Sequence, residues 1–290
     1  MKKILVTGSN GQVGSELQAI ASNFNDFEFI FTSRKDFDMS SLESIEDFFH
    51  HHLPDYCINC AAYTAVDKAE SEPEIAKLTN ATSVAYLAMN CKLMSVPLVH
   101  ISTDYVYHSG QNIPFDEADE TNPLSVYAQT KLEGELLALD IHSPTMVIRT
   151  SWVYSSFGNN FVKTMLRLGK ERESLGVVFD QIGTPTYARD LANAILIILT
   201  KVENGELEKN VLQGTFHYSN EGVTSWYDFA KAIFVEKNIA CKVNPIETSQ
   251  FPTPAQRPPF SLMNKNKIKT TFQITIPHWQ ESLKEMLALV

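Results

Sequence analysis

The chain has 290 residues, of which 44% are hydrophobic and 20% are charged, a composition typical of a globular protein with a substantial core. Its formal net charge of −10 disfavours binding to nucleic acid, whose phosphates repel an acidic protein. No apolar run approaches the roughly 20 residues of a membrane-spanning helix, and the apolar stretch after Met1 is too short for a signal peptide. We therefore expect a cytoplasmic protein that binds neither nucleic acid nor membrane.

Short apolar runs alternate with helical patterns through the first half of the chain. Strands are predicted at KILVTG, FEFIFTS, DYCINCAA, PLVHIST and TMVIRTS, and helices at 12–22, 42–51, 73–91 and 124–139. Such alternation predicts parallel strands joined by right-handed helical crossovers. We expect an α/β fold in which residues 1–150 form a Rossmann-like doubly wound parallel sheet that binds NAD(P).

The pattern is looser after residue 150. Helical patterns at 160–172 and 187–201, a short GVVFD strand and a loop with Gly and Pro indicate a smaller C-terminal substrate-binding lobe. We expect residues 151–290 to form mainly this lobe, with some segments returning to the Rossmann sheet. The proline-rich FPTPAQRPPF segment cannot be a helix or a central strand, so it should be a surface loop of the kind that often contacts ligands.

Two of the four cysteines, Cys57 and Cys60, have a CxxC spacing. This spacing can indicate metal or redox chemistry. The apolar neighbours in DYCINCAA instead favour a buried strand in which cysteine behaves as a small apolar residue.

The segment GSNGQVG, Gly8 to Gly14, directly follows the first predicted strand and begins a helix. Gly8 and Gly11 permit a tight turn and a close approach of backbone N–H groups to a pyrophosphate, and Gly14 permits close packing of the helix on the sheet. A compact turn without a ligand is the alternative. The strand-turn-helix setting favours a dinucleotide site.

The second predicted strand ends at Thr32-Ser33-Arg34, without the acid that commonly binds the ribose of NAD. Arg34 can pair with a 2′-phosphate, and Ser33 can donate a hydrogen bond to it. We therefore expect a preference for NADPH, with NADH as the alternative if Arg34 is only a solvated loop cation.

The strongest catalytic signal combines STDYVY, at the end of the fourth predicted strand, with YAQTK at the start of the next helix. Tyr127 and Lys131 are four residues apart and lie on one helical face. We expect the cation to favour the phenolate and to lower the pKa of Tyr127 from its usual value near 10. Tyr127 would then protonate the oxygen of a carbonyl that receives hydride from the cofactor, and Thr103 would hydrogen-bond the same oxygen.

These motifs resemble those of the extended short-chain dehydrogenase/reductase superfamily. Four further segments, at 61–74, 149–172, 180–192 and the PAQRP loop, are similar to those of the dTDP-4-dehydrorhamnose reductases in order and spacing. This resemblance implies reduction of the 4-keto group of dTDP-4-dehydro-6-deoxy-L-mannose to dTDP-L-rhamnose, with a dTDP-linked keto-deoxysugar as the partner. Thr103, Tyr127 and Lys131 match the catalytic positions of the family.

Together, the motifs and the resemblance predict two sets of binding residues. The predicted cofactor-binding residues are Gly8, Asn10, Gly11, Gln12, Val13, Gly14, Ser33, Arg34, Asp38, Met39, Ala61, Ala62, Tyr63, Tyr127 and Lys131. The predicted substrate-binding residues are Thr103, Asp104, Trp152, Asn159, Asn160 and Arg257. For Arg257, the expected role is a paired contact to the diphosphate. Arg257 as a structural cap and Trp152 as a core aromatic stay open as alternatives.

Some members of the family form dimers through a magnesium site built from glutamates. Glu16 matches one of these positions, but Arg189 stands where a second glutamate is expected. An arginine would repel a cation that needs several oxygen ligands. We therefore predict no metal ligand and regard magnesium as doubtful, while a homodimer stays open.

Two other functions are compatible with the motifs. One is a reductase or epimerase that acts on a different nucleotide-linked 4-keto sugar; a dehydratase is disfavoured because Asp104 is followed by Tyr105 and not by a second acid. The other is a non-catalytic NADP-binding regulatory subunit, resembling that of methionine adenosyltransferase. The presence of Thr103, Tyr127 and Lys131 together favours an enzyme.

Overall fold

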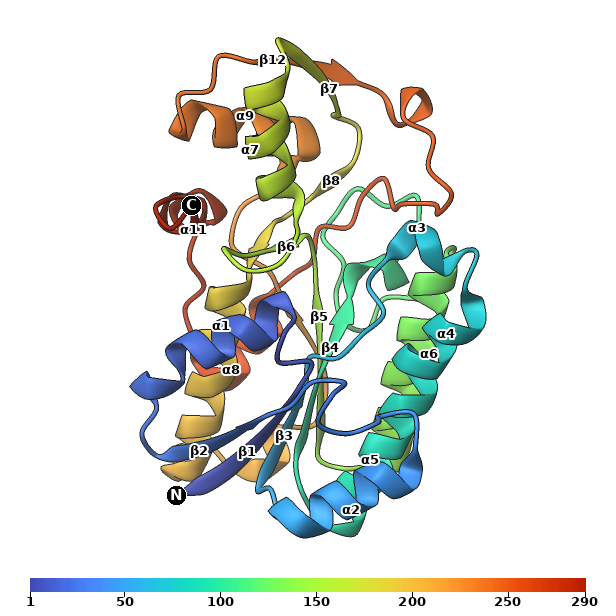
Figure 1. Cartoon of the computed structure of the whole chain (residues 1–290), viewed down its shortest axis with the longest axis vertical. Helices are drawn as coiled ribbons and strands as arrows, with labels where there is room; N and C mark the ends of the chain where they lie inside the picture. Colours follow the sequence, from blue (N-terminus) through green and yellow to red (C-terminus); the bar gives the residue numbers. More distant parts are fainter.

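A six-stranded, entirely parallel sheet lies at the centre of the larger of two lobes in the computed structural model, which describes residues 1–290 (Figure 1). Its strand order is β10-β5-β4-β3-β1-β2. The strands are β1 (Lys2–Thr7), β2 (Phe27–Phe31), β3 (Tyr56–Asn59), β4 (Leu98–Thr103), β5 (Thr145–Thr150) and β10 (Gly214–Tyr218). Helices pack on both faces of this sheet, so the predicted doubly wound α/β fold is confirmed.

The order of the strands reverses between β1 and β3. The chain passes from β1 outward to β2 and then returns to β3, β4 and β5 on the other side of β1. In sheets of this kind, ligands bind in the crevice beyond the carboxyl ends of the strands on either side of the reversal. Here these ends are Thr7 of β1 and Asn59 of β3, with Thr103 of β4 beside them.

Two layers of helices cover the sheet (Figure 1). On one face, α1 (Gln12–Ile20) and α8 (Ala188–Glu203) pack against strands β1, β3 and β5, and α10 (Asn266–Phe272) packs beside β10. On the other face lie α2 (Leu42–His52), α5 (Ser83–Leu93) and α6 (Val126–Ile141). Each face buries its own apolar cluster, as expected for a parallel sheet with both faces covered.

Helix α8 does not belong to the smaller lobe, although the sequence pattern assigned 187–201 to it. Its apolar residues, including Leu191, Ile195 and Ile198, are buried in the same cluster as Ile4 and Val6 of β1. The apolar stripe of α8 matches the open face of the sheet beside α1, and burying it there removes the stripe from water. This helix is one of the segments that return to the Rossmann sheet, as β10 is.

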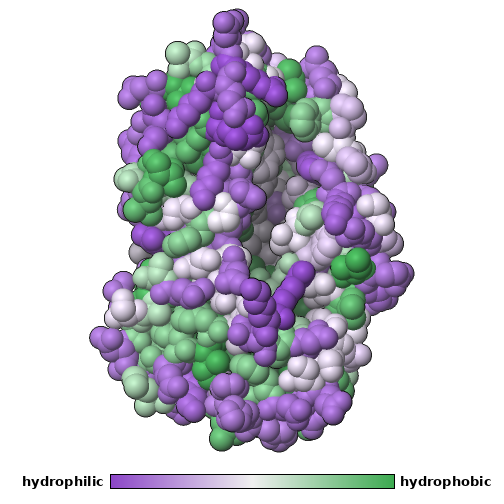
Figure 2. All heavy atoms as spheres, in the orientation of Figure 1, coloured by the Kyte–Doolittle hydropathy of each residue, from purple (hydrophilic) through white to green (hydrophobic).

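The smaller lobe lies at the carboxyl ends of the strands and has a separate core (Figure 1). Its helices are α7 (Phe161–Glu171), α9 (Trp226–Glu236) and α11 (Trp279–Leu287). Three short strand pairs complete it: β7 (Ser174–Val178) with β12 (Lys242–Ile246), β6 (Val153–Tyr154) with β9 (Thr186–Tyr187), and β8 (Ile182–Gly183) with β11 (Thr224–Ser225). The face shown in Figure 2 is hollowed between the two lobes.

The segment between β3 and α5 contains two short helices, α3 (Val66–Ala69) and α4 (Pro73–Lys77), and a π-helical turn at Leu78–Thr82. Single turns of 3₁₀ helix lie at Ala21–Asn23, Asp104–Val106, Lys209–Val211 and Thr248–Gln250. None of the helices is both long and apolar enough to cross a membrane.

Helix α6 lies unusually close to the π-helical turn. A Cβ atom added at Gly134 would lie 1.9 Å from the carbonyl oxygen of Asn80. The Asn80 side chain also bridges the two segments, since its Nδ2 donates to Thr130 Oγ1 of α6 (3.2 Å) and to the carbonyl of Tyr63 (3.2 Å). The absence of a side chain at Gly134 therefore sets the distance of α6 from its neighbour.

We expect Gly134→Ala to lower the free energy of unfolding by about 1–3 kcal/mol, because the added methyl group meets backbone and not a flexible side chain. The expected loss of stability is opposite in sign to the usual effect, because the same substitution in an unhindered helix stabilises it by about 1 kcal/mol. Urea denaturation of the variant measures this difference. Gly110→Ala is the control, because nothing lies within 4 Å of a Cβ added there. Equal stability of the two variants would contradict the close approach.

Candidate active site

The glycine segment after β1 forms an open loop at the amino end of α1. Gly8 has φ +65°, and a Cβ at this position would lie 2.6 Å from the backbone N of Ala61. A Cβ at Gly14 would lie 2.5 Å from the carbonyl oxygen of Gly8. No side chain caps α1 at Gly11, and its first turn contains no acid. The free N–H groups and the helix dipole are therefore available to an anion such as a pyrophosphate.

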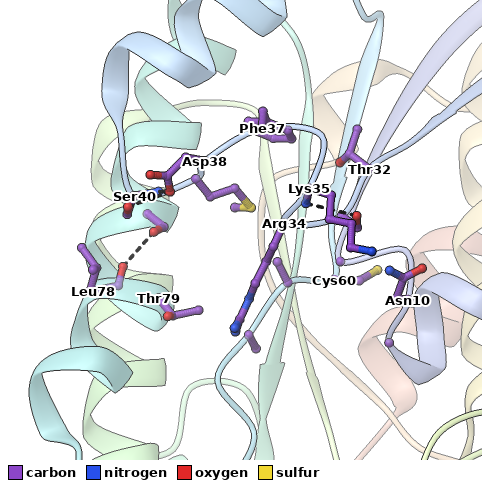
Figure 3. A pocket seen from close by; sticks show the side chains of 17 residues that line it. Asn10, Thr32, Arg34, Lys35, Phe37, Asp38, Ser40, Cys60, Leu78 and Thr79 are labelled. Atoms are coloured by element: carbon purple, nitrogen blue, oxygen red, sulfur yellow. Dashed lines mark hydrogen bonds between the residues drawn. The ribbon is translucent and has the colours of Figure 1, made fainter.

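A first cavity of about 590 Å³ extends from this loop. It is lined by the glycine loop, by the segment after β2, by the segment after β3 and by the π-helical turn with the start of α5 (Figure 3). It brings together nine predicted cofactor residues: Gly8, Asn10, Gly11, Ser33, Arg34, Asp38, Met39, Ala61 and Ala62. In Figure 3 the exposed side chain of Arg34 extends across the cavity toward the side formed by Thr79.

The hydrogen-bond donors of Ser33 have a partner within the loop. Its backbone N and its Oγ donate to Asp36 Oδ2 at 2.5 and 2.8 Å. These bonds lower the pKa of the Asp36 carboxyl group. A 2′-phosphate at this position would have to compete with Asp36 for Ser33, whereas Arg34 faces the cavity. Asp36 lies beyond the end of β2, and no motif in the sequence indicated its role.

A second cavity of about 520 Å³ lies beyond the carboxyl end of β4. It shares Asn10, Gly11, Cys60 and Ala62 with the first cavity, so the two cavities adjoin, and together they are called the groove. The predicted site residues that line it are Asn10, Gly11, Gln12, Val13, Ala62, Thr103, Asp104, Tyr127, Lys131, Trp152 and Asn159. Residues far apart in the sequence thus meet where the strand order predicts a ligand.

The start of α6 places Tyr127 and Lys131 in this second cavity. Ser125 caps the helix by accepting a hydrogen bond from the backbone N of Ala128 (3.2 Å). Lys131 is one turn beyond Tyr127 and is almost fully buried, and its Nζ donates to the carbonyl oxygen of Ile101 in β4 (2.6 Å). Burial lowers the pKa of Lys131 to about 8, against an opposing effect of the Glu135 carboxylate.

The prediction for the Tyr127 phenol was wrong in direction. Burial raises its pKa to about 12; the nearby Thr103 hydroxyl acts to lower it, and the Asp104 carboxylate acts to raise it further. Lys131 does not reverse this effect, and its ammonium group donates to the Ile101 carbonyl. The consequence suits an acid catalyst, because the phenol is fully protonated at neutral pH and has a proton to donate.

Asp104 is a second unusual acid in the cavity. It is 1% exposed; its Oδ1 accepts a hydrogen bond from Thr103 Oγ1 (3.2 Å), and its Oδ2 has no partner. Burial raises its pKa to about 7, although the hydrogen bond with Thr103 opposes the shift. The neighbouring Ser102 Oγ is also buried without a partner. Buried polar atoms of this kind are rare in folded proteins and suit a site that receives a polar ligand.

Four predicted residues do not line either cavity: Gly14, Tyr63, Asn160 and Arg257. Gly14 lies behind the loop, where it permits the close packing described above. Tyr63 Oη donates to Glu72 Oε2 (2.7 Å). Asn160 caps α7 by accepting from the backbone N of Lys163 (3.1 Å), and its Nδ2 donates to Gln12 Oε1 (2.9 Å). These contacts give Tyr63 and Asn160 structural roles next to the groove.

Arg257 is engaged with a carboxylate of the larger lobe. Its Nη1 and Nη2 donate to Asp67 Oδ1 (3.1 Å) and Oδ2 (2.9 Å), and Nη1 also donates to the carbonyl of Ala255 (3.1 Å). The backbone N of Ala255 donates to Asp67 as well (3.2 Å). The proline-rich loop is therefore fastened to α3 beside the groove by Asp67, a partner that the sequence did not reveal.

Several residues that line the groove were missed by the sequence analysis. The second cavity also includes Cys60, Thr64, Val66, Ile101, Ser102, Tyr105, Thr150, Val153, Gly158 and Trp226, and the first includes Thr32, Lys35, Phe37, Ser40, Cys60, Leu78, Thr79 and Ser83. Cys60, Ser102 and Thr150 lie at or next to the carboxyl ends of predicted strands, and this position could have identified them as lining residues. Trp226 comes from the smaller lobe, and no sequence pattern indicated it.

The cysteine pair is divided between the strand and the groove. The prediction of a buried strand is confirmed for Tyr56–Asn59, so Cys57 lies within β3 and is fully buried. The strand ends before Cys60, which is partly exposed in the groove. Burial raises the pKa of the Cys60 thiol to about 12, so the thiol stays protonated and is a poor nucleophile at neutral pH.

Glu16, the position considered for a metal, is paired within the chain. It is fully buried, its Oε2 accepts from Arg189 Nε (2.8 Å), and its Oε1 accepts from Ser155 Oγ (2.6 Å). Both oxygens are thus occupied by donors of the protein. No group of three or more His, Cys, Asp or Glu side chains is arranged to hold a metal ion.

Comparisons with known proteins agree over the whole chain. The family profile described as RmlD substrate binding domain matches residues 1–290. The dTDP-4-dehydrorhamnose reductase of Escherichia coli K12 is 41% identical over 296 aligned positions, which cover 98% of this chain and 96% of that protein. A crystal structure of such a reductase from Clostridium acetobutylicum has 43% identity and a TM-score of 0.91, covering 99% of both chains. Another, from Bacillus anthracis in complex with NADP, has 36% identity and a TM-score of 0.92, covering 100% of both chains.

The raised pKa of Asp104 predicts a pH dependence of stability. Between the ordinary value of 3.8 and about 7, the folded state binds a proton that the unfolded state lacks, so stability falls as the pH rises through this window. Asp104→Asn removes this loss. We expect its stability relative to the wild type to increase by on the order of 4 kcal/mol from about pH 4 to about pH 8. Urea denaturation across this range measures the change. The exposed Asp26 provides the control substitution, and a pH-independent difference for Asp104→Asn would contradict the assignment.

Proposed function

This chain belongs to the family of the dTDP-4-dehydrorhamnose reductases, and we propose that it reduces the 4-keto group of dTDP-4-dehydro-6-deoxy-L-mannose to give dTDP-L-rhamnose, with Thr103, Tyr127 and Lys131 as catalytic residues. The observation that carries this proposal is the single groove in which these three side chains meet the glycine loop. Members of the superfamily with other reactions share the fold, so the residues of the site and not the fold support the assignment.

The residues of the first cavity suit NADPH. The uncapped amino end of α1 and the backbone of Gly8 to Gly11 would hold the pyrophosphate, at a loop where a Cβ on Gly8 would meet the backbone of Ala61. The guanidinium of Arg34 would pair with the 2′-phosphate. When bound, NADPH supplies the hydride that the reduction requires. Ala62, which lines both cavities, would then lie along the cofactor between its two ends.

The chain supplies the proton. As the carbonyl oxygen of the sugar gains negative charge, the O–H bond of Tyr127 breaks and a new O–H bond forms on that oxygen. Thr103 stabilises the same oxygen with a hydrogen bond from its hydroxyl group. Lys131, buried one helical turn away, stabilises the phenolate that remains after proton transfer. Burial makes each of these interactions stronger than it would be in water.

Asp104, Trp152 and Asn159 line the same cavity and are the proposed contacts to the sugar and its nucleotide. Arg257 stays a predicted contact to the diphosphate. Because its guanidinium is bound to Asp67, a diphosphate at this position would have to share or replace that carboxylate. The cytoplasmic location and the homodimer also stay predictions from the sequence.

Replacing Tyr127 with Phe tests the catalytic assignment. The change removes the proton donor and keeps the ring, so we expect kcat to fall at least about 100-fold while NADPH binds as before. The assay follows the loss of NADPH absorbance with dTDP-4-dehydro-6-deoxy-L-mannose, generated in place by the epimerase reaction that forms it, and the product is identified by mass and NMR. Tyr86→Phe, which changes a phenol of α5 that lines neither cavity, is the matched control. Unchanged turnover in the Tyr127 variant would remove the mechanism.

Replacing Arg34 with Ala tests the choice of cofactor. Loss of a charge-assisted bond to a phosphate costs about 1.5–3 kcal/mol, which corresponds to a rise in KM for NADPH of roughly tenfold or more. The KM for NADH, which lacks the 2′-phosphate, should stay the same and serves as the internal control. Steady-state kinetics with both cofactors measures the two values. A parallel rise in both would mean that Arg34 acts on the shape of the cavity and not on the phosphate.

A further inference from the structure

Trp226, the first residue of α9, lines the second cavity from the smaller lobe. Its indole stacks on that of Trp152, with the ring centroids 3.7 Å apart and an angle of 11° between the planes. We propose that Trp226 is a positioning residue, which holds the Trp152 indole as an apolar wall against the deoxysugar and thereby determines the affinity for it. This inference rests on the proposed function, in which Trp152 contacts the sugar.

The backbone of Trp152 is in a conformation that its surroundings must maintain. Its φ of +48° lies in the left-handed region, which a large side chain rarely adopts. Such strain persists only where neighbouring contacts over-determine the position, and it is concentrated at functional sites. Here Ser151 Oγ donates to the carbonyl of Thr184 (2.6 Å), and the backbone N of Thr186 donates to the carbonyl of Trp152 (3.3 Å). The backbone on both sides of the indole is thus tied to one segment, 184–186.

The indole of Trp152 is confined by Gly183 as well as by Trp226. A Cβ at Gly183 would lie 3.0 Å from Cε2 and from Cζ2 of the ring, closer than ordinary van der Waals contact. Strand β11 pairs antiparallel with β8 and places Thr224 opposite Gly183, so Trp226 follows directly after this pairing. The pairing of β8 with β11 is therefore what brings the two indoles together.

The position of Trp226 is itself fixed. Ser225 caps α9 by accepting a hydrogen bond from the backbone N of Asp228 (3.0 Å), and its Oγ donates to Asp228 Oδ2 (2.6 Å). The ring of Phe161, the first residue of α7, packs against Trp226 with centroids 4.7 Å apart. Trp226 is thus anchored by two helices of the smaller lobe, and it can hold Trp152 in one orientation.

The stacked pair lies next to the polar end of the cavity. The Cβ position at Gly183 is also 3.0 Å from Ser261 Oγ, and Trp152 and Trp226 line the same cavity as the polar residues Thr103 and Asp104. A 6-deoxysugar carries a methyl group where other hexoses carry a hydroxyl group. An indole face can bury that methyl group favourably, whereas burying an unpaired hydroxyl group there is costly. The wall therefore suits the deoxysugar of the proposed reaction.

Trp279 shows what a tryptophan with a packing role looks like in this chain. It is 5% exposed, lies in the core of the smaller lobe and contacts Phe229 edge to face with centroids 5.7 Å apart. It lines neither cavity. Trp226, in contrast, is partly exposed in the groove. Trp279→Phe is therefore the matched control for substitutions of Trp226.

The test compares Trp226→Ala, Trp226→Phe and Trp279→Phe by steady-state kinetics, by calorimetric titration with the product dTDP-L-rhamnose, and by circular dichroism. Two stacked indoles give an exciton couplet in the circular dichroism spectrum, which reports the pair directly.

We expect Trp226→Ala to raise KM for the keto-sugar about tenfold, to weaken product binding similarly, and to leave KM for NADPH within about twofold. Trp226→Phe should lose the couplet and keep KM for the keto-sugar within about threefold of the wild type, since an aromatic ring still supports Trp152. Trp279→Phe should keep both the couplet and the kinetics.

Unchanged affinity for sugar and product in Trp226→Ala would overturn the proposal, and so would an equal loss of affinity for NADPH, because that pattern reports general damage to the groove. If Trp226→Ala does not fold, Gly183→Ala provides the second variant. Its added methyl group would displace the Trp152 indole where the ring contacts Gly183. This variant should also raise KM for the sugar and leave KM for NADPH unchanged. A wild-type protein that does not turn over the keto-sugar would contradict the proposed function. The titration with dTDP-L-rhamnose would still decide the role of Trp226, since it needs no turnover.

Discussion

The position of α6 over the sheet depends on a buried ion pair between Glu135 and Arg149. Arg149 of β5 is bound to both carboxylate oxygens of Glu135, with its Nε at 3.1 and 3.2 Å, and neither residue is more than 5% exposed. Burying two charges is costly unless further hydrogen bonds satisfy them. Arg149 meets this condition by also donating to Tyr107 Oη, which in turn contacts Nε2 of His217 in β10 (2.7 Å). One network therefore joins α6, β5 and β10. It fixes the position of α6 along the sheet, and with it the positions of Lys131 and Tyr127 at the carboxyl ends of the strands.

The same burial that makes this network costly determines the chemistry of the groove. It raises the pKa of Tyr127 and of Asp104 and lowers that of Lys131, so all three groups are shifted toward their neutral forms. A neutral phenol can donate a proton, and a weakly solvated ammonium group interacts strongly with a phenolate that forms beside it. Asp104 Oδ2 and Ser102 Oγ lack partners within the protein. Unpaired buried polar atoms cost stability, and such costs are commonly found at functional sites.

The sequence was sufficient to predict the parallel sheet, the glycine loop and the meeting of Thr103 with Tyr127 and Lys131, because strand alternation and residue spacing carry this information. The sequence does not show how deeply the Tyr127 phenol is buried, so the direction of its pKa shift was predicted wrongly. Strand β10 was also missed, since GTFHY contains a histidine that only the contacts of His217 with Tyr107 and Asn264 make compatible with a buried strand. Trp226 and Asp67 act through contacts between lobes, and such contacts leave no periodic pattern in the chain. The assignment of 187–201 to the smaller lobe failed because an apolar stripe predicts a buried helical face but not which core buries it.

The chain crosses repeatedly between the two lobes. After residue 150 it forms α7 and β7 in the smaller lobe, returns to the sheet as α8 and β10, forms α9 and β12, returns again as α10, and ends at α11 in the smaller lobe (Figure 1). A single cut after residue 150 therefore cannot release either lobe as a folding unit, because the sheet would lose β10 and two of the three helices, α8 and α10, that cover one of its faces. The crossings also act as several parallel tethers in place of one hinge. Opening the groove widely would bend all of them together, so its width is a property of the whole molecule and not of one flexible joint.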